Sequence, residues 1–290
     1  MTTTTNSSRT FGIELEIVGI TQEAAAAAIN ATGLVARVES YNHARRTWWK
    51  VTTDASVKEV RNGVTVSGCE VVSPVLAGSE GLAQVEKVCK ALEAAGARVN
   101  KTCGMHVHVG AGDLTVKQIA TAVKLWVKHE DRVNQLISPS RRGYDATGYQ
   151  PSYFCRDNLY TLTGGVHQAD WTQVFARIDR CRTIDQLCDL FGGQYGGETR
   201  YHKLNLVSYF RHSTSEVRCH QGTVNAEKAC QWIKFCLGLV DQAAARSKVN
   251  HKRTSKLSNL FSAVNLEASG RRFYAKRARE LAREAAAAAA

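Results

Sequence analysis

Three segments of the sequence each place two charged or titratable side chains two positions apart, around one apolar residue. They are Glu14-Leu15-Glu16, His106-Val107-His108 and Glu216-Val217-Arg218. Side chains alternate between the two faces of a β-strand, so each pair shares one face and its apolar neighbours share the other. The pattern predicts strands with one polar face. A solvated strand face has the same period, so a single pair admits both interpretations.

Hydrophobic periodicity predicts the other elements of the chain. We expect strands at 10–18, 34–39 and 47–53, a hairpin over 56–72 that turns at "RNG", and a strand within "KTCGMHVHVGAG". We expect helices at about 21–32, 79–96, 115–137 and 225–246, and short helices at 156–163, 168–178 and 183–190. Two strands are expected over 202–221, the first of them in "YHKLNLVSY".

This order of elements predicts one α+β domain with a mainly antiparallel sheet. Residues 1–10 are expected to be a disordered lead, and 11–246 the folded catalytic domain. Residues 138–200 are expected to be an inserted, substrate-facing region, and 247–290 a basic helical tail.

The cysteines and the absence of common motifs exclude several classes of protein. The nine cysteines are scattered and include no CxxC pair, which argues against zinc fingers and disulfide frameworks and favours the reducing cytoplasm. No apolar run is long enough to span a bilayer, and the polar start "MTTTTNSSRT" is unlike a secretory signal. The sequence also lacks GxxxxGK[ST] and GxGxxG motifs, so it is not a P-loop or Rossmann protein.

The formal net charge of +12 is concentrated at the end of the chain. Residues 246–290 hold eleven Lys or Arg against three Glu, a net charge of +8. Such a segment predicts a polyanionic partner, either a nucleic acid or an acidic protein. The alternative is a solvated helix that keeps the protein soluble.

Two further carboxylates lie in apolar surroundings, Asp54 after "WKVTT" and Glu70 within "SGCEVVSP". Charged groups are seldom found there unless they are paired or bind a cation. Together with Glu14, Glu16, Glu216 and one imidazole they form an oxygen-rich set, which favours Mg²⁺ or Mn²⁺ over Zn²⁺. We expect two or more ions, because so many carboxylates in one cleft would otherwise repel one another. Carboxylates, divalent ions and arginines together indicate phosphoryl transfer from a nucleotide.

Six segments in this order resemble the amidoligase family of carboxylate–amine ligases, relatives of glutamine synthetase and glutamate–cysteine ligase. They are "FGIELE", "TTDASV", "CEVVSP", "CGMHVHV", "RYHKLNL" and "SEVRCHQGT". The resemblance covers about residues 11–243. It implies a glutamine-synthetase-like half-barrel: a curved, mainly antiparallel sheet with helices packed on its outer face, and with ATP and metal ions on its concave face.

The resemblance also implies roles for individual residues. The metal ligands it implies are Glu14, Glu16, Asp54, Glu70, His106 and Glu216. His108 would approach the substrate or phosphate, and Arg218 would steady the transferred phosphoryl group. The further phosphate or substrate contacts it implies are Lys203, Asn205 and Arg211. His220 and Gln221 belong to the family's last motif, to which we assign no role.

The activity implied is formation of an amide from a carboxylate and an amine through an acyl phosphate made from ATP. The acceptor is left open among amino acids, peptides, proteins and modified nucleic acids, as is assembly into homo-oligomers. Two other functions compete with this one. One is a metal-dependent phosphotransferase or hydrolase on the same sheet, and the other is a nucleic-acid-binding protein that uses the basic tail. A nucleophilic Cys103 or Cys219 is a third and weaker hypothesis.

Overall fold

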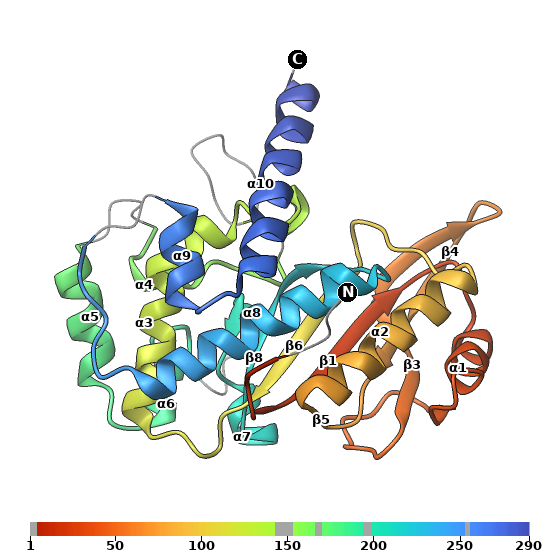
Figure 1. The fold of residues 1–290 in the computed structure, drawn as a ribbon, viewed down its shortest axis with the longest axis horizontal. Coiled ribbons are helices and arrows are strands. Elements are labelled where there is room, and N and C mark those ends of the chain that lie inside the picture. Colours follow the sequence, from red (N-terminus) through yellow and green to blue (C-terminus); the bar gives the residue numbers. More distant parts are fainter. Residues whose placement is uncertain (1–4, 143–152, 166–169, 194–198, 253–255, 290) are drawn as a thin grey trace. The chain divides into compact units, whose positions relative to one another are not determined.

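The computed structural model describes residues 5–142, 153–165, 170–193, 199–252 and 256–289. The chain divides into two compact units, each built from two stretches of sequence. The first unit contains residues 1–108 and 220–234, and the second contains residues 109–219 and 235–290. Figure 1 labels most of the helices and strands of both units.

The first unit is built on an open sheet with the strand order β2-β3-β4-β1-β6, in which β5 also pairs with β1. The strands are β1 (Thr10–Ile17), β2 (Ala36–Val38), β3 (Trp49–Arg61), β4 (Val64–Val72), β5 (Leu76–Ala77) and β6 (Gly104–Gly110). The β1–β4, β3–β4 and β1–β5 pairs are antiparallel, and β2 pairs with β3 in parallel. These pairings confirm an α+β fold with a mainly antiparallel sheet.

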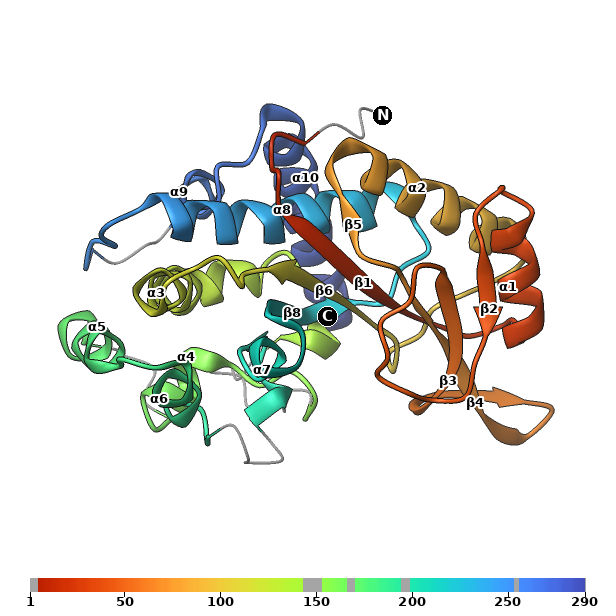
Figure 2. The ribbon, with the colours of Figure 1, turned by 90° about the horizontal axis from the view of Figure 1, so that it is seen from below.

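Helices cover the apolar face of this sheet. The alternate residues Phe11, Ile13, Leu15 and Ile17 of β1 are all buried. A Cβ on Gly81 of α2 (Gly78–Ala94) would lie 3.1 Å from the Phe11 ring, which shows that α2 packs against the start of β1 on this face. Figure 2 shows α2 and α1 (Gln22–Asn30) on one side of the strands. The intervening residues of β1, which include Glu14 and Glu16, therefore point away from the helices.

The segment 47–72 differs from the prediction at one point. We expected a strand at 47–53 and a separate hairpin over 56–72, but β3 runs without interruption from Trp49 to Arg61. A register shift between Asp54 and Lys58 accommodates the irregular stretch as a bulge rather than a break. The predicted turn is confirmed, because Asn62 and Gly63 both have positive φ, 51° and 78°.

The second unit is largely helical. Its helices are α3 (Val116–Val133), α4 (Asn158–Leu162), α5 (Trp171–Arg180), α6 (Ile184–Asp189), α7 (Ser208–His212), α9 (Leu257–Ala263) and α10 (Ala268–Ala289). Helix α8 (Ala226–Ala245) begins in the first unit and ends in the second. The helices expected at 115–137, 156–163, 183–190 and 225–246 are confirmed. Of the helix expected at 168–178, residues 168 and 169 lie outside the described residues, and α5 contains residues 171–178.

The strand expected in "YHKLNLVSY" is mostly wrong. Strand β7 contains only Leu204 and Asn205, which pair antiparallel with Val217 and Glu216 of β8 (Thr214–Gln221), and α7 follows. Local hydrogen bonds explain the early end of the strand. The Asn205 side chain accepts from the Val207 amide at 2.9 Å, and the Ser208 hydroxyl donates to the Asn205 carbonyl at 3.1 Å. Such side-chain bonds to nearby backbone compete with extended structure.

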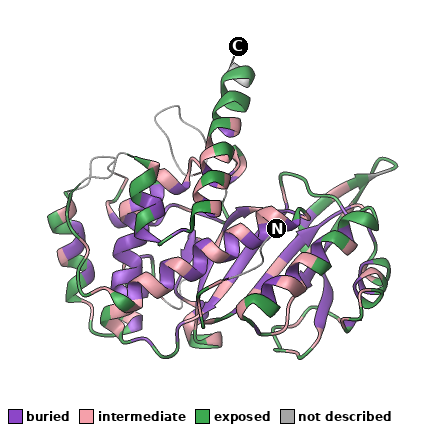
Figure 3. Ribbon diagram, viewed as in Figure 1, coloured by how far each residue is buried: buried purple, intermediate pink, exposed green. Residues whose placement is uncertain are grey.

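The basic C-terminal segment contains the helices α9 and α10, while its described residues 247–252, 256 and 264–267 are not helical. The segment is also part of a core. Tyr274 of α10 is 1% exposed, and its ring lies 6.0 Å from Phe235 and 6.3 Å from Phe261. Figure 3 shows that the last turns of α10 are exposed. Among the described helices, none has both the length and the apolar composition needed to cross a membrane.

Candidate active site

The polar face of the first unit's sheet carries a row of side chains across three strands. Glu16 of β1 lies opposite Glu70 of β4, and Glu70 lies opposite Thr52 of β3. Residues directly opposite each other in a sheet project from the same face, and Asp54 follows Thr52 by one strand period. The alternation and the strand pairing thus bring together three carboxylates that lie far apart in the sequence.

The carboxylates of Glu16, Asp54 and Glu70 form a close cluster. Each offers an oxygen, and these oxygens all lie within 4.8 Å of one another. Glu16 and Glu70 are buried, with 5% and 8% exposure. Glu16 also accepts a hydrogen bond from the Gly104 amide of β6 at 2.5 Å, and Asp54 accepts one from the Ser56 amide at 2.6 Å. The backbone therefore holds two of the three carboxylates in place.

The electrostatics of this cluster fit a divalent cation. Burial raises the pKa of Glu70 well above its ordinary value, and the charges of Glu14, Asp54 and Glu16 raise it further. Lys50 opposes this shift, although its ammonium donates to the Asn42 carbonyl at 2.6 Å. Carboxylate oxygens at this spacing are the donors that Mg²⁺ and Mn²⁺ prefer, and a cation would remove the repulsion.

A buried hydroxyl beside the cluster supports the same conclusion. Thr52 is fully buried opposite Glu70, and within the described residues its Oγ1 has no hydrogen-bond partner. A buried hydroxyl without a partner is costly, so the site suits a ligand or hydrated ion that supplies one. The sequence did not single out this residue, because a threonine in a strand is ordinary.

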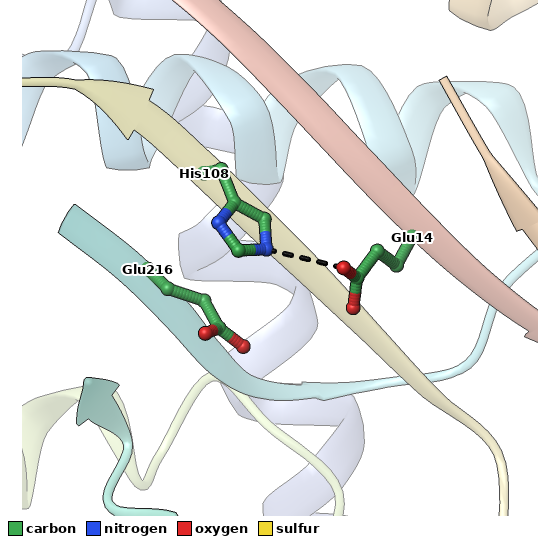
Figure 4. Close-up of side chains that lie close together, drawn as sticks. All are labelled: Glu14, His108 and Glu216. Atoms are coloured by element: carbon green, nitrogen blue, oxygen red, sulfur yellow. Dashed lines mark ion pairs between the residues drawn. The ribbon is translucent and has the colours of Figure 1, made fainter. Parts of the chain in front are cut away.

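Glu14 links the two histidines of β6. His106 Nδ1 lies 2.8 Å from Glu14 Oε2, and His106 Nε2 lies 3.6 Å from Glu16 Oε1. His108 Nε2 lies 3.3 Å from the other oxygen of Glu14, and Figure 4 marks this ion pair with a dashed line. Burial would raise the pKa of Glu14, but the bonds from His106 and His108 outweigh it and hold the pKa well below its ordinary value. Glu14 is therefore an anion at neutral pH, whereas Glu70 gives up its proton less readily than an ordinary carboxyl.

The third predicted pair, Glu216 and Arg218, lies on β8 in the second unit. The Asn205 side-chain amide donates to Glu216 Oε2 at 2.6 Å. Arg218 Nη1 lies 3.3 Å from Glu216 Oε1, and the same guanidinium donates to the backbone carbonyls of Phe154 at 2.9 Å and Arg200 at 3.2 Å. Both charged groups are thus oriented before any ligand arrives, which is the arrangement that electrostatic catalysis requires.

Lys203 precedes this pair of strands and lies in a buried polar cluster. Its side chain is fully buried, and the ammonium donates to the carboxylate of Asp157 and to the side-chain oxygen of Asn134. The resemblance implied that Lys203 contacts phosphate or substrate. In the structure its charge lies beside Asp157 in the interior.

Glu130 of α3 completes the buried cluster. Its carboxylate accepts from Trp126 Nε1 at 2.8 Å and from the amides of Asn158 at 2.9 Å and Leu159 at 2.6 Å. Burial, assisted by the charge of Asp157, raises the pKa of Glu130 to about 8. The carboxyl therefore holds its proton at neutral pH, which leaves Lys203 and Asp157 as the charged pair. No motif in the sequence indicated this cluster.

A family model described as "Putative amidoligase enzyme" matches residues 7–240. The chain belongs to this amidoligase family. The match includes both units' predicted site residues and ends before the basic segment. No curated protein matches the sequence.

The remaining residues that the amidoligase resemblance singled out lie in varied surroundings. Arg211 is exposed on α7. His220 is buried, with Nδ1 2.7 Å from the Gln221 carbonyl oxygen and its ring 5.0 Å from the Trp232 ring. These contacts are those of a residue that packs the end of β8 onto α8.

The cysteines beside the motifs are poorly suited to nucleophilic chemistry. Cys103 and Cys219 are both fully buried. Burial is the largest influence on Cys219 and raises the pKa of its thiol. Because the thiolate is the reactive form, a buried thiol with a raised pKa is inert at neutral pH.

Proposed function

We propose that this member of the amidoligase family is an ATP-dependent ligase that joins a carboxylate to an amine. The observation that carries the proposal is the cluster of Glu16, Asp54 and Glu70, with oxygens within 4.8 Å of one another and a raised pKa at Glu70. A site that repels its own carboxylates is suited to divalent cations, and ATP is used by enzymes as a metal complex. The proposal includes the fold that the resemblance implies, in which the sheet of this chain is a glutamine-synthetase-like half-barrel.

The residues of the first unit would hold Mg²⁺ or Mn²⁺, in two or more sites. Glu16, Asp54 and Glu70 are proposed as direct ligands, and Glu14 as a ligand oriented by His106 and His108. When bound, the ions would neutralise charge on the transferred phosphoryl group. For His106 and for Glu216 of the second unit, metal ligation stays a prediction of the family resemblance.

The reaction proposed has two steps. A carboxylate oxygen of the substrate attacks the γ-phosphorus of ATP, the bond to ADP breaks, and an acyl phosphate forms. The amine nitrogen then attacks the acyl carbon, loses a proton, and releases phosphate that retains the carboxylate oxygen. Arg218, held by two carbonyls and Glu216, is proposed to stabilise the charge on the moving phosphoryl group.

The experiment that tests this function traps the acyl phosphate with hydroxylamine. The protein is incubated with ATP, Mg²⁺ and pooled amino acids, and ADP and hydroxamate are both measured. A ligase forms hydroxamate only when ATP, Mg²⁺ and an acid are all present. If ADP is released but no pool yields hydroxamate, the protein is instead a phosphotransferase or hydrolase.

Metal binding is tested separately by thermal unfolding with Mg²⁺ or with EDTA. An ion present at about 100 times its Kd stabilises the native state by about 2.7 kcal/mol, which corresponds to a rise in Tm of roughly 5–10 °C. Glu70→Gln should abolish this rise. Glu93→Gln, on the exposed side of α2, is the matched control and should retain it. Equal responses in the two variants would exclude the cluster as the metal site.

A further inference from the structure

Three aromatic side chains in the second unit gather into one exposed group. The ring centroids of Tyr153, Phe154 and Tyr201 lie 5.1–5.3 Å from one another. Tyr153 is 49% exposed and Phe154 is 41% exposed. Large rings are normally buried, and a cluster of them at the surface indicates an interaction site rather than ordinary packing.

Three arginines accompany the rings. The guanidinium of Arg156 lies 4.7 Å from the Tyr153 ring centroid, and that of Arg200 lies 4.7 Å from the centroid of Tyr201. Arg218 lies 5.5 Å from the same Tyr201 ring. Arg156 is half-buried and Arg200 is exposed, whereas the Arg218 side chain is only 13% exposed and donates to the carbonyls of Phe154 and Arg200. Arginine stacks readily on aromatic faces, and these contacts place Arg156 and Arg200 beside the exposed rings. We refer to these six residues as the aromatic–arginine surface.

The chemistry of this surface matches an unpaired nucleotide. An aromatic ring stacks on the flat face of a base, and an arginine binds the phosphate beside it with two parallel hydrogen bonds. The pairing of exposed rings with guanidinium groups is the arrangement by which proteins hold single strands without reading their sequence. A base paired inside a duplex presents no free face, so the rings favour single strands.

The charge of the same unit is complementary to a polyanion. Residues 246–290 carry a net charge of +8. Within them, the exposed residues Arg272, Lys276, Arg279 and Arg283 follow one another along α10 at spacings of four, three and four. Such spacing places all four side chains on one stripe of the helix. A stripe of cations attracts a phosphate backbone through its charge alone.

We propose that the aromatic–arginine surface of the second unit binds single-stranded nucleic acid. The proposal goes beyond the ligase function, since it requires neither ATP nor a metal ion. The rings supply stacking, Arg156 and Arg200 supply phosphate contacts, and the stripe on α10 adds sequence-independent attraction.

The test is a fluorescence-anisotropy titration of the full chain with labelled oligothymidylate, in EDTA and without ATP. The variant Tyr153→Ala/Phe154→Ala removes two exposed rings and keeps the Phe154 carbonyl that holds Arg218. The matched control Tyr41→Ala/Phe210→Ala removes two rings of similar exposure, 58% and 44%, elsewhere on the chain. We expect the first variant to lose about tenfold or more in affinity and the control to bind as the unaltered protein does.

A salt series and two competitors separate stacking from general charge attraction. Arg156→Gln/Arg200→Gln should lower both the affinity and the steepness of its salt dependence, whereas the ring variant should leave the steepness unchanged. Equal loss in the ring variant and its control would overturn the proposal. So would equal competition by polyglutamate, which would indicate an acidic protein as the partner, or equal affinity for duplex DNA. Because the titration contains no ATP or metal, its outcome is independent of the ligase test.

Discussion

Replacing Lys203 by methionine should destabilise the second unit far more than the same substitution at the surface. Methionine keeps most of the length of the side chain but has no charge. The ammonium that it removes is fully buried and donates to Asp157 and to Asn134. Asp157 is itself only 8% exposed, so its charge would remain in the interior without a counter-ion.

The size of the expected loss in the free energy of unfolding follows from the burial of this ion pair. Removing one member of a buried ion pair costs about 3–5 kcal/mol, because the partner's charge is left without compensation. An exposed pair on a helix is worth only about 0.3–0.5 kcal/mol. Lys90→Met is therefore the matched control, since Lys90 and Glu86 form such a pair on α2, with side chains 64% and 20% exposed. We expect the two variants to differ by about 3 kcal/mol or more.

Urea unfolding, followed by circular dichroism and tryptophan fluorescence, measures the free energy of unfolding that Lys203→Met and Lys90→Met each lose. Trp126 reports on the cluster directly, because its indole donates to Glu130. The double variant Lys203→Met/Asp157→Asn should recover part of the stability, since no charge is left unpaired. A Lys203→Met protein within about 1 kcal/mol of the unaltered protein would refute the assignment of Lys203 to a buried ion pair.

Three further predictions concern single side chains. The raised pKa of Glu130, about 8, means that the native state keeps a proton that the unfolded state has lost, so its stabilising contribution is lost as pH rises toward 8. The free energy of unfolding should fall by about 2 kcal/mol between about pH 6.5 and 8.5, and Glu130→Gln should lack this part of the decline. If the free energies of the two proteins change in parallel with pH, the raised pKa does not belong to Glu130. Asn205→Ala should lower turnover by about 10- to 100-fold while the circular dichroism spectrum is retained, because Glu216 loses the amide that orients it; unchanged turnover would show that Glu216 needs no such support. Arg218→Ala should lower ATP turnover by about 10²-fold or more in protein that circular dichroism shows to be folded at the assay temperature, and undiminished turnover would remove Arg218 from the mechanism.

The parts of the fold that could be predicted depend on short-range regularities. Strand β1, helices α2 and α3 and the turn at Asn62 and Gly63 follow from periodicity and from turn chemistry, which act within a few residues. The pairing of Glu14 with His106 and His108 also follows from alternation, once β1 and β6 are neighbours. The prediction of a strand over 201–209 was wrong for a related reason. Its hydrophobic pattern suits a strand, but Asn205 and Ser208 bond to the local backbone and turn the chain into α7.

Buried charge is harder to predict, because it is decided by residues far away in the sequence. "RYHKLNL" reads the same whether the ammonium of Lys203 meets a phosphate or a carboxylate. The residues that determine which partner the ammonium contacts are Asp157, 46 positions earlier, and Asn134, 69 positions earlier. Neither stands in a motif, and Asp157 lies in the region 138–200 that we expected to be an insertion. The family resemblance transfers a role by position within a motif, and it cannot register that a partner from outside the motif has neutralised the charge. A lysine in a family motif can therefore be assigned to phosphate only when no carboxylate from elsewhere in the fold reaches its ammonium first.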